Sequence, residues 1–424
     1  MLIELPYGAA VVRAELAKAR VLGRLTVGEG RPAAFSQEEL VRRALAQPVG
    51  QDGPLRARVK AGEQVVVLVS DQFRQTRADV VVPVLLSELA AGGVSEQDVS
   101  ILFATGTHRP PMAAEQASVL GEDLYGRFRE RVFVHNAFDS KRLAHVGDTS
   151  RGTPVRVNKM ALEADRLIAT GTVVFHYFAG YGGGRKSVVP GVAGAETIAH
   201  NHVMNLHPRE DRLDPAVRIG ALDGNPIAED MLEAARFVPV DCIVNTVLDR
   251  DGRIAGVFAG DLDAAHRQAA ELAREMFAAP IAERADFVVA SSGTAANFVQ
   301  AHKALYNAFQ AMKPGGRVVF VAECAEGLGG EQFEKWLRLG TRESIIAGLR
   351  RQSDINGQTA LSSLEKCPSA IFVTRMGEEE TRLLGARKAE SFQAALALAR
   401  AECELDEPAC YVMPQASYTV PFME

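Results

Sequence analysis

Residues 64–108 decide the fold of this 424-residue chain. They read QVVVLVSD (64–71), an apolar run that ends in polar residues, then DVVVPVLLSELAAGG (79–93), which has the pattern of a helix, then VSILFATGTH (99–108). Short β-rich runs that alternate with longer helical patterns are typical of α/β proteins with parallel sheets. The stretch therefore predicts a strand, a crossover helix and a second, parallel strand.

The same alternation continues along the chain and then starts afresh. RLIATGTVVF (166–175) predicts another strand, and FVVASS (287–292) opens a second series of strands and helices. A chain of this length is too long for one ordinary hydrophobic core. We therefore predict an α/β protein with two lobes, mainly parallel sheets and an active-site cleft between the lobes. The predicted domains are residues 1–275 and 276–424.

Composition and charge exclude several classes of protein. Apolar residues make up 47% and charged residues 24%, as in ordinary globular proteins, and the net charge of −6 argues against a general nucleic-acid binder. No apolar run is long enough to span a membrane, and the start, MLIELPYGAA, lacks the pattern of a secretion signal. We expect a cytoplasmic protein with a small-molecule ligand and no nucleic-acid or membrane partner.

Polar side chains follow the predicted strands at the points where those strands end. Asp71 and Arg74 follow the first strand, His108 ends the second, and His176 follows the strand at 166–175. Ligands of open α/β sheets bind outside the carboxyl ends of the strands. These four residues therefore mark the expected site.

A glycine-rich loop, HYFAGYGGGRKSVVPG (176–191), continues from the strand at 166–175. It approaches the phosphate-binding pattern GxxxxGK[ST], but Arg185 stands where the last glycine belongs, and HYFA separates the loop from the strand. A nucleotide-dependent transferase that uses this loop to bind phosphate is one open hypothesis.

Histidines gather around the same loop. Four of the nine histidines, namely His176, His200, His202 and His207, lie between residues 176 and 207. Imidazole suits zinc, copper, iron or nickel, yet no cysteine or paired carboxylate stands nearby to complete a cage of protein ligands. A metal bound here would take most of its ligands from something other than side chains.

Five motifs, in order along nearly the whole chain, carry a family resemblance. They are SDQFRQTR (70–77), ATGTHR (104–109), the glycine loop, Asn201-His202 and QAHKAL (300–305). This combination resembles the lactate racemase family, the nickel-pincer racemases and epimerases of 2-hydroxy acids. The resemblance implies a cofactor, a pyridinium mononucleotide whose two sulfur-containing arms hold nickel through S, C and S. It also implies separate maturation enzymes that make this cofactor.

The resemblance assigns roles around the cofactor. Lys186 is expected to be joined covalently to one thio-arm of the nickel-pincer nucleotide, and His202 to be the fourth nickel ligand. His200 is the competing ligand, although its spacing from the lysine fits less well. The other residues expected to line the cofactor are Asp71, Gly182, Gly183, Gly184, Arg185 and Ser187.

The resemblance also assigns roles around the substrate. His108 and His176 are expected to be the two bases, one for each enantiomer, because mirror-image hydroxyls point in different directions when the carboxylate is held in one place. Arg74 is the expected carboxylate clamp, with Arg77 and Arg109 as alternatives. Gln300 and Lys303 lie three residues apart on one face of a predicted helix and are expected to contact substrate oxygens.

The implied activity is racemisation or epimerisation of a lactate-like 2-hydroxy acid. Hydride leaves C2 for the cofactor and returns to the opposite face, through a 2-keto acid. Two segments depart from the family pattern near the expected substrate: Phe73 and Gln75 flank the arginine, and Asn297 and Val299 precede Gln300. These departures leave the identity of the 2-hydroxy acid open. A non-catalytic carrier or sensor of the cofactor is the third hypothesis.

Overall fold

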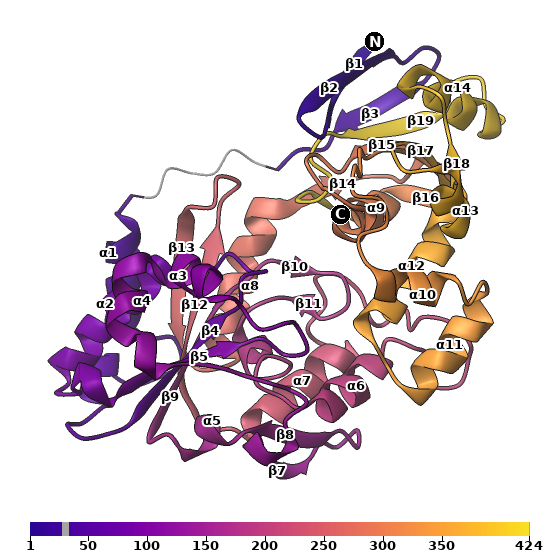
Figure 1. Cartoon of the computed structure of the whole chain (residues 1–424). Coiled ribbons are helices and arrows are strands. Elements are labelled where there is room, and N and C mark those ends of the chain that lie inside the picture. The colour runs from indigo at the N-terminus through magenta and orange to yellow at the C-terminus, as the bar shows by residue number, and fades with distance from the viewer. Residues whose placement is uncertain (28–33, 424) are drawn as a thin grey trace. The chain divides into compact units, whose positions relative to one another are not determined.

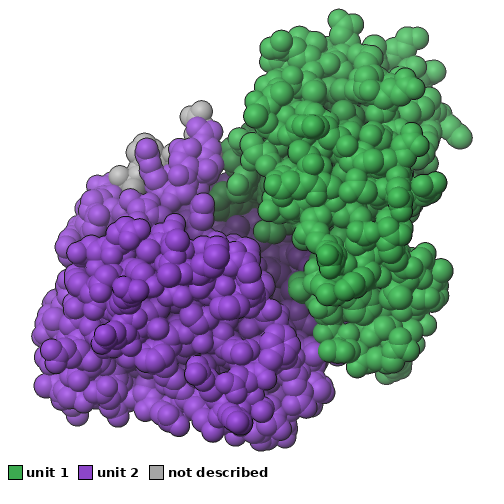
Figure 2. Space-filling view, viewed as in Figure 1, with its two compact units in different colours: residues 1–28, 206–213, 277–424 green, residues 29–205, 214–276 purple. Residues whose placement is uncertain are grey.

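The computed structural model describes residues 1–27 and 34–423, which form two compact units (Figure 2). Unit 1 comprises Met1–Gly28, Leu206–Leu213 and Phe277–Glu424, and unit 2 comprises Glu29–Asn205 and Asp214–Met276. The break near residue 277 lies close to the predicted boundary. The division differs from the prediction at the N-terminus and at residues 206–213, because both segments pack with the C-terminal half of the chain.

Unit 2 is built around a six-stranded sheet (Figure 1). The strand order is β13-β12-β9-β4-β5-β6, and every neighbouring pair is parallel except β12 and β13, which form an antiparallel hairpin. The strands are β4 (Val65–Ser70), β5 (Val99–Ala104), β6 (Val132–Val134), β9 (Arg166–Thr172), β12 (Val240–Leu248) and β13 (Ile254–Gly260). The predicted strands at 64–71, 99–108 and 166–175 are thus central members of one sheet.

Helices and short hairpins complete unit 2. The helices are α1 (Gln37–Ala46), α2 (Ala78–Ala91), α3 (Ala113–Leu120), α4 (Glu122–Phe128), α5 (Lys159–Glu163), α6 (Ala195–Val203), α7 (Pro226–Arg236) and α8 (Ala264–Phe277). The antiparallel pairs are β7 (Leu143–Asp148) with β8 (Pro154–Asn158), and β10 (Phe175–His176) with β11 (Gly180–Tyr181). Buried apolar side chains of α2, including Val81 and Leu85, pack with β4 and β5 in one core. This core fixes the strand ends that carry the predicted site.

The direction of chain winding reverses in the middle of the unit 2 sheet. From β4 the chain adds β5 and β6 on one side, and it then crosses to β9 and β12 on the other side. The carboxyl ends of β4 and β9 therefore flank a topological switch point, the usual ligand-binding position in an open α/β sheet. Asp71 follows β4 and His176 follows β9 at this position.

Unit 1 contains a second six-stranded sheet, which is parallel throughout, in the order β18-β17-β16-β15-β19-β3. Its strands are β3 (Arg20–Arg24), β15 (Ala285–Ser291), β16 (Met312–Val321), β17 (Ala370–Val373), β18 (Arg387–Lys388) and β19 (Ala409–Met413). Smaller pairs are β1 (Leu2–Tyr7) with β2 (Ala10–Glu15), and β14 (Ala278–Ile281) with β20 (Val420–Met423). The N-terminal residues belong to this unit because β3 extends its sheet beside β19.

The helices of unit 1 are α9 (Phe298–Gln310), α10 (Glu331–Leu337), α11 (Arg342–Arg351), α12 (Ile355–Lys366), α13 (Glu378–Leu383) and α14 (Phe392–Glu402). With the parallel sheets, they confirm the predicted α/β class for both halves of the chain. Within residues 1–27 and 34–423, no helix is both long enough and apolar enough to cross a membrane.

Candidate active site

The turn after β4 holds a carboxylate against a histidine. Asp71 is only 2% exposed, its Oδ1 accepts the Phe73 N–H (3.1 Å), and its carbonyl accepts the Arg74 N–H (3.1 Å). Its Oδ2 lies 2.6 Å from Nδ1 of His108, which follows β5. A carboxylate only accepts hydrogen bonds, so Nδ1 of His108 carries the proton in this pair and Nε2 is left with the lone pair. The dyad presents a proton acceptor at the predicted site.

Three arginines lie in the same two loops, and their partners distinguish them. The Arg77 guanidinium pairs with Asp79, and Arg109 makes two hydrogen bonds to Glu115, at 2.7 and 2.5 Å. Arg74 is exposed, and its guanidinium donates to the Phe73 carbonyl (3.2 Å); among the described residues no carboxylate pairs with it. Of the three candidates, Arg74 therefore has its charge available for a substrate carboxylate.

A small hairpin after β9 turns the glycine loop back toward His176. In the pair β10–β11, His176 lies opposite Gly180, and the chain then enters a 3-10 turn at Gly184–Ser187. As a result, Nζ of Lys186 lies 3.4 Å from Nε2 of His176 and 5.4 Å from the centre of the Phe178 ring. The hairpin explains how residues ten positions apart meet.

The pKa of Lys186 is unusually low for a lysine. Burial, followed by the positive charges of Arg74 and Arg185, lowers the pKa of Lys186 to about 7. A large fraction of its amine is therefore uncharged near neutral pH. The effect of Arg74 also places the β4 turn within electrostatic range of the glycine loop.

The histidines of α6 differ in where they point. His202 is 7% exposed and packs edge-on against Phe178, with ring centres 5.0 Å apart. Burial and then the charge of Lys186 lower the pKa of His202 to about 3. His200 is exposed, and its Nδ1 contacts the Glu196 carbonyl one turn earlier in the helix. The structure therefore brings His202, and not His200, together with Lys186.

A buried network that sequence reasoning missed fixes α6. Asp230 of α7 is fully buried and accepts hydrogen bonds from Thr149, Thr153 and Asn201. Asn201 also donates to the Ile227 carbonyl (3.1 Å), so the residue beside His202 ties α6 to α7. A lone aspartate in an amphipathic helix gives no signal of this role, because its three partners come from distant parts of the chain.

The glycines of the loop allow close packing against β9 and α8. A Cβ on Gly183 would lie 2.7 Å from the Val173 side chain, and one on Gly184 would lie 2.5 Å from His266 of α8. The Gly184 N–H already donates to Asn245 (2.8 Å). A phosphate cradle needs free N–H groups, so this arrangement argues against the P-loop hypothesis.

Two of the residues predicted to line the cofactor form hydrogen bonds with neighbouring protein groups. Ser187 donates to the Thr170 carbonyl (2.8 Å). The buried Arg185 guanidinium contacts Nδ1 of His266 (3.1 Å) and the Ala179 carbonyl (3.2 Å), and burial lowers the pKa of Arg185 to about 10. Both side chains stabilise the loop through these bonds, and their contact with the cofactor stays a prediction. Gly182 also packs closely against the chain, because a Cβ added to it would lie 3.2 Å from the Thr172 carbonyl oxygen.

Gln300 and Lys303 lie in unit 1, on α9. The Asn297 side chain caps this helix by accepting the Gln300 N–H (3.1 Å), and Oε1 of Gln300 accepts the Ala296 N–H (3.1 Å). Both Gln300 and Lys303 are exposed. Their contact with substrate oxygens stays a prediction.

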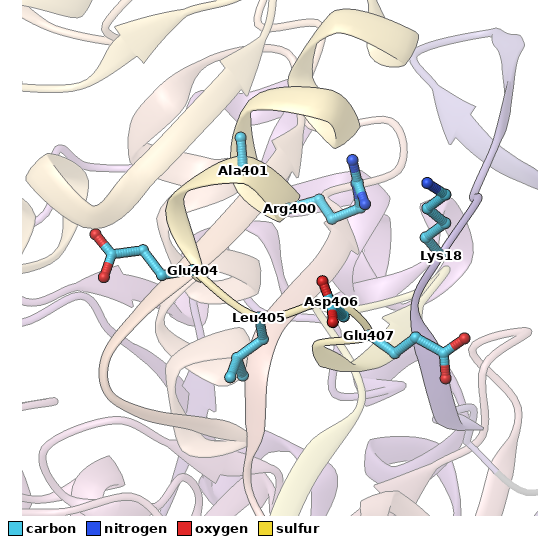
Figure 3. Close-up of a pocket in the computed structure, with 7 residues that line it drawn as sticks. All are labelled: Lys18, Arg400, Ala401, Glu404, Leu405, Asp406 and Glu407. Carbon is cyan, nitrogen blue, oxygen red and sulfur yellow. The ribbon is translucent and has the colours of Figure 1, made fainter.

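A surface hollow of about 560 Å³ in unit 1 contains none of the predicted site residues (Figure 3). It is lined by Lys18, Arg400, Ala401, Glu404, Leu405, Asp406 and Glu407. No histidine is among them, and charged groups of both signs surround it. We therefore place the candidate active site at the switch point of unit 2.

Comparisons with known proteins identify the family of the chain. An Asp-His pair, a lysine with a lowered pKa and a neutral histidine, gathered at a sheet switch point, are typical of an α/β enzyme. The family model for the lactate racemase N-terminal domain matches residues 7–213, and that for the lactate racemase C-terminal domain matches residues 281–416. The chain belongs to the lactate racemase family.

Individual relatives support the same assignment. The lactate racemase of Thermoanaerobacterium thermosaccharolyticum is 35% identical over 340 residues, which cover 79% of this chain and 78% of the relative. That of Lactiplantibacillus plantarum is 33% identical over 338 residues, 78% and 77% of the two chains. The structure of the lactate racemase apoprotein from T. thermosaccharolyticum superimposes with a TM-score of 0.89, 29% identity and full coverage of both chains. A Thermotoga maritima protein, at 20% identity and a TM-score of 0.62, covers 94% of this chain and all of its own and shares the fold.

Proposed function

We propose that this protein racemises or epimerises a lactate-like 2-hydroxy acid with a nickel-pincer nucleotide attached to Lys186. The observation that carries the proposal is the grouping of Lys186 with His202 and His176, beside the Asp71–His108 dyad, at the switch point of unit 2. Membership of the lactate racemase family supports it.

The side chains at the site fit the proposed cofactor. A buried amine with a pKa near 7 is a competent nucleophile for forming a covalent link at neutral pH. A metal ligand must be a neutral imidazole, and the lowered pKa of His202 keeps its ring in that form. Among the described residues, no group of three or more His, Cys, Asp or Glu side chains is arranged to hold a metal. Nickel held here needs ligands supplied by the nucleotide itself, with His202 as the protein ligand.

In this proposal, the side chains of the site divide the reaction steps among them. The Arg74 guanidinium binds the substrate carboxylate with two parallel hydrogen bonds. Nε2 of His108 removes the proton of the C2 hydroxyl while Asp71 stabilises the resulting imidazolium through Nδ1. Lys186 and His202 would hold the cofactor, which would supply a reversible acceptor for the C2 hydrogen as hydride.

In this proposal His176 is the base for the opposite enantiomer, but its ring proton lies on a different nitrogen from that of His108. Its Nδ1 accepts the Ala179 N–H (3.2 Å), so the neutral ring carries its proton on Nε2, the atom that faces Lys186. To act as a base through Nε2, the ring must move that proton to Nδ1 and give up the bond from Ala179. His108 needs no such proton shift, because its Nε2 already carries the lone pair.

The test uses protein produced together with the cofactor-making enzymes. A single enantiomer of a 2-hydroxy acid is incubated in deuterated water, and the product is analysed by chiral chromatography and mass spectrometry. We expect inversion with little deuterium at C2, since the hydrogen leaves and returns as hydride. Extensive deuterium incorporation at C2 contradicts the hydride route, and the absence of inversion contradicts the proposed activity.

A further inference from the structure

We infer that Phe73 forms an apolar wall of the substrate site and selects monocarboxylic 2-hydroxy acids with a bulky apolar group on C3. The inference rests on the proposed function, because it places the substrate between Arg74 and His108. It names the substrate class that this site prefers over lactate and over dicarboxylic or sugar acids.

Phe73 precedes the proposed clamp in the chain and contacts the proposed base. It directly precedes Arg74, and its ring meets the His108 imidazole edge-on, with ring centres 5.2 Å apart at an angle of 79°. The ring remains 49% exposed in spite of these contacts. A substrate whose carboxylate meets Arg74 and whose hydroxyl meets His108 would therefore have the exposed part of this ring beside it.

Backbone and side-chain contacts fix the segment that carries the Phe73 ring. The Phe73 N–H is bound to Asp71, and the Arg109 guanidinium lies 5.3 Å from the ring centre. The Gln72 amide donates to the Arg109 carbonyl (3.4 Å), which joins the β4 turn to the loop after β5. A preorganised apolar surface loses little conformational entropy when a ligand covers it.

The geometry at C2 leaves one substituent for this wall. Of the four groups on C2, the carboxylate belongs to Arg74, the hydroxyl to His108 and the hydrogen to the hydride acceptor. The fourth group is the carbon chain that begins at C3. A racemase must accept this chain in two mirror-image placements, and an aromatic face suits both because apolar contact is not directional.

The charges of the surrounding loops argue against a second carboxylate on the substrate. The Arg77 and Arg109 guanidinium groups are already paired with Asp79 and Glu115. In the two described loops after β4 and β5, only Arg74 is left without a carboxylate partner. An aromatic ring also offers no partners for the hydroxyls of a sugar acid.

The experiment measures binding and inversion separately on cofactor-loaded protein. Calorimetry gives the Kd for lactate, 2-hydroxy-4-methylpentanoate, 3-phenyllactate and malate, and chiral chromatography gives the inversion rate for each. We expect 3-phenyllactate to bind about tenfold more tightly than lactate, a conservative value for contact with an aromatic face. We expect malate to bind no better than lactate.

Variants show whether Phe73 causes the preference. Phe73→Ala should lower the ratio of lactate Kd to 3-phenyllactate Kd about tenfold, and Phe73→Leu should lower it less. Phe138→Ala is the matched control, because Phe138 is 72% exposed and follows β6 at the edge of the same sheet. Equal or tighter binding of lactate or malate overturns the inference, as does a ratio that Phe73→Ala leaves unchanged. Selective binding without inversion contradicts the proposed function alone.

Discussion

The lowered pKa of Lys186 gives a prediction that needs neither cofactor nor substrate. In protein made without the cofactor-making enzymes, the amine is free to react with an acylating reagent, and only its neutral form reacts. With a pKa of about 7, half of the amine is neutral at pH 7. A lysine with the ordinary pKa of about 10.4 is neutral in only about 0.04% of molecules at that pH. The neutral fraction of Lys186 is therefore about a thousandfold larger than that of an ordinary surface lysine.

The assay is competitive acylation with quantification of each lysine by peptide mass spectrometry, from pH 5 to pH 11. Because burial disfavours the charged amine, the labelling rate of Lys186 should rise through pH 7 and level off above about pH 8. Arg74→Ala removes a positive charge that lowers the pKa of Lys186, so it should move the midpoint to higher pH. A midpoint above pH 9.5 in the unaltered protein refutes the reasoning, since the lysine then behaves like a solvated amine.

Three further perturbations test the rest of the site. Asp71→Asn should lower kcat/KM about 10²- to 10⁴-fold without loss of nickel, because His108 then loses the carboxylate that fixes its ring proton; unchanged turnover contradicts the dyad. Arg74→Ala should raise KM by tenfold or more, whereas Arg109→Ala should change it less than threefold because Glu115 already neutralises Arg109; equal effects contradict the choice of clamp. Asp230→Ala should lower the free energy of unfolding by about 2–4 kcal/mol in urea, since three buried donors lose their acceptor, and a change below about 0.5 kcal/mol contradicts the network.

The sequence predicted the parts of the site that depend on strand ends. Each parallel strand with a polar carboxyl end delivers its residues to one edge of the sheet, so Asp71, His108 and His176 could be placed there before the structure was known. The spacing from Lys186 favoured His202 over His200, and the structure brings His202 to the lysine. The two α/β halves follow from the same alternation of strands and helices.

Contacts between distant segments could not be predicted. Asp71 and His108 are 37 positions apart, and nothing in the sequence sets the 2.6 Å approach of their side chains. The acidic partners of Arg77 and Arg109 lie nearby in the sequence, but that they form these pairs became visible only in the fold, and the pairs single out Arg74. Arg185 and Ser187 fitted a ligand-binding pattern, but only the fold shows that they also hydrogen-bond to His266, Ala179 and Thr170.

The N-terminal residues show the same limitation at the level of domains. β3 adds to the edge of the unit 1 sheet beside β19, although nearly 400 residues separate the two strands along the chain. Residues 206–213 leave unit 2 for unit 1, where Arg350 of α11 donates to the carbonyls of His207 and Glu210. Sequence reasoning assigns segments to domains by proximity along the chain, so it does not show that both segments pack with unit 1.

The central claim is that Lys186 and His202 together hold a nickel-bearing nucleotide. It is tested most directly by intact-mass and nickel analysis of protein produced with the cofactor-making enzymes. We predict a covalent mass increase that is present in the unaltered protein and in His202→Ala, absent in Lys186→Ala, and accompanied by reduced nickel in His202→Ala. A mass increase that persists in Lys186→Ala, or nickel that is undiminished in His202→Ala, contradicts the account.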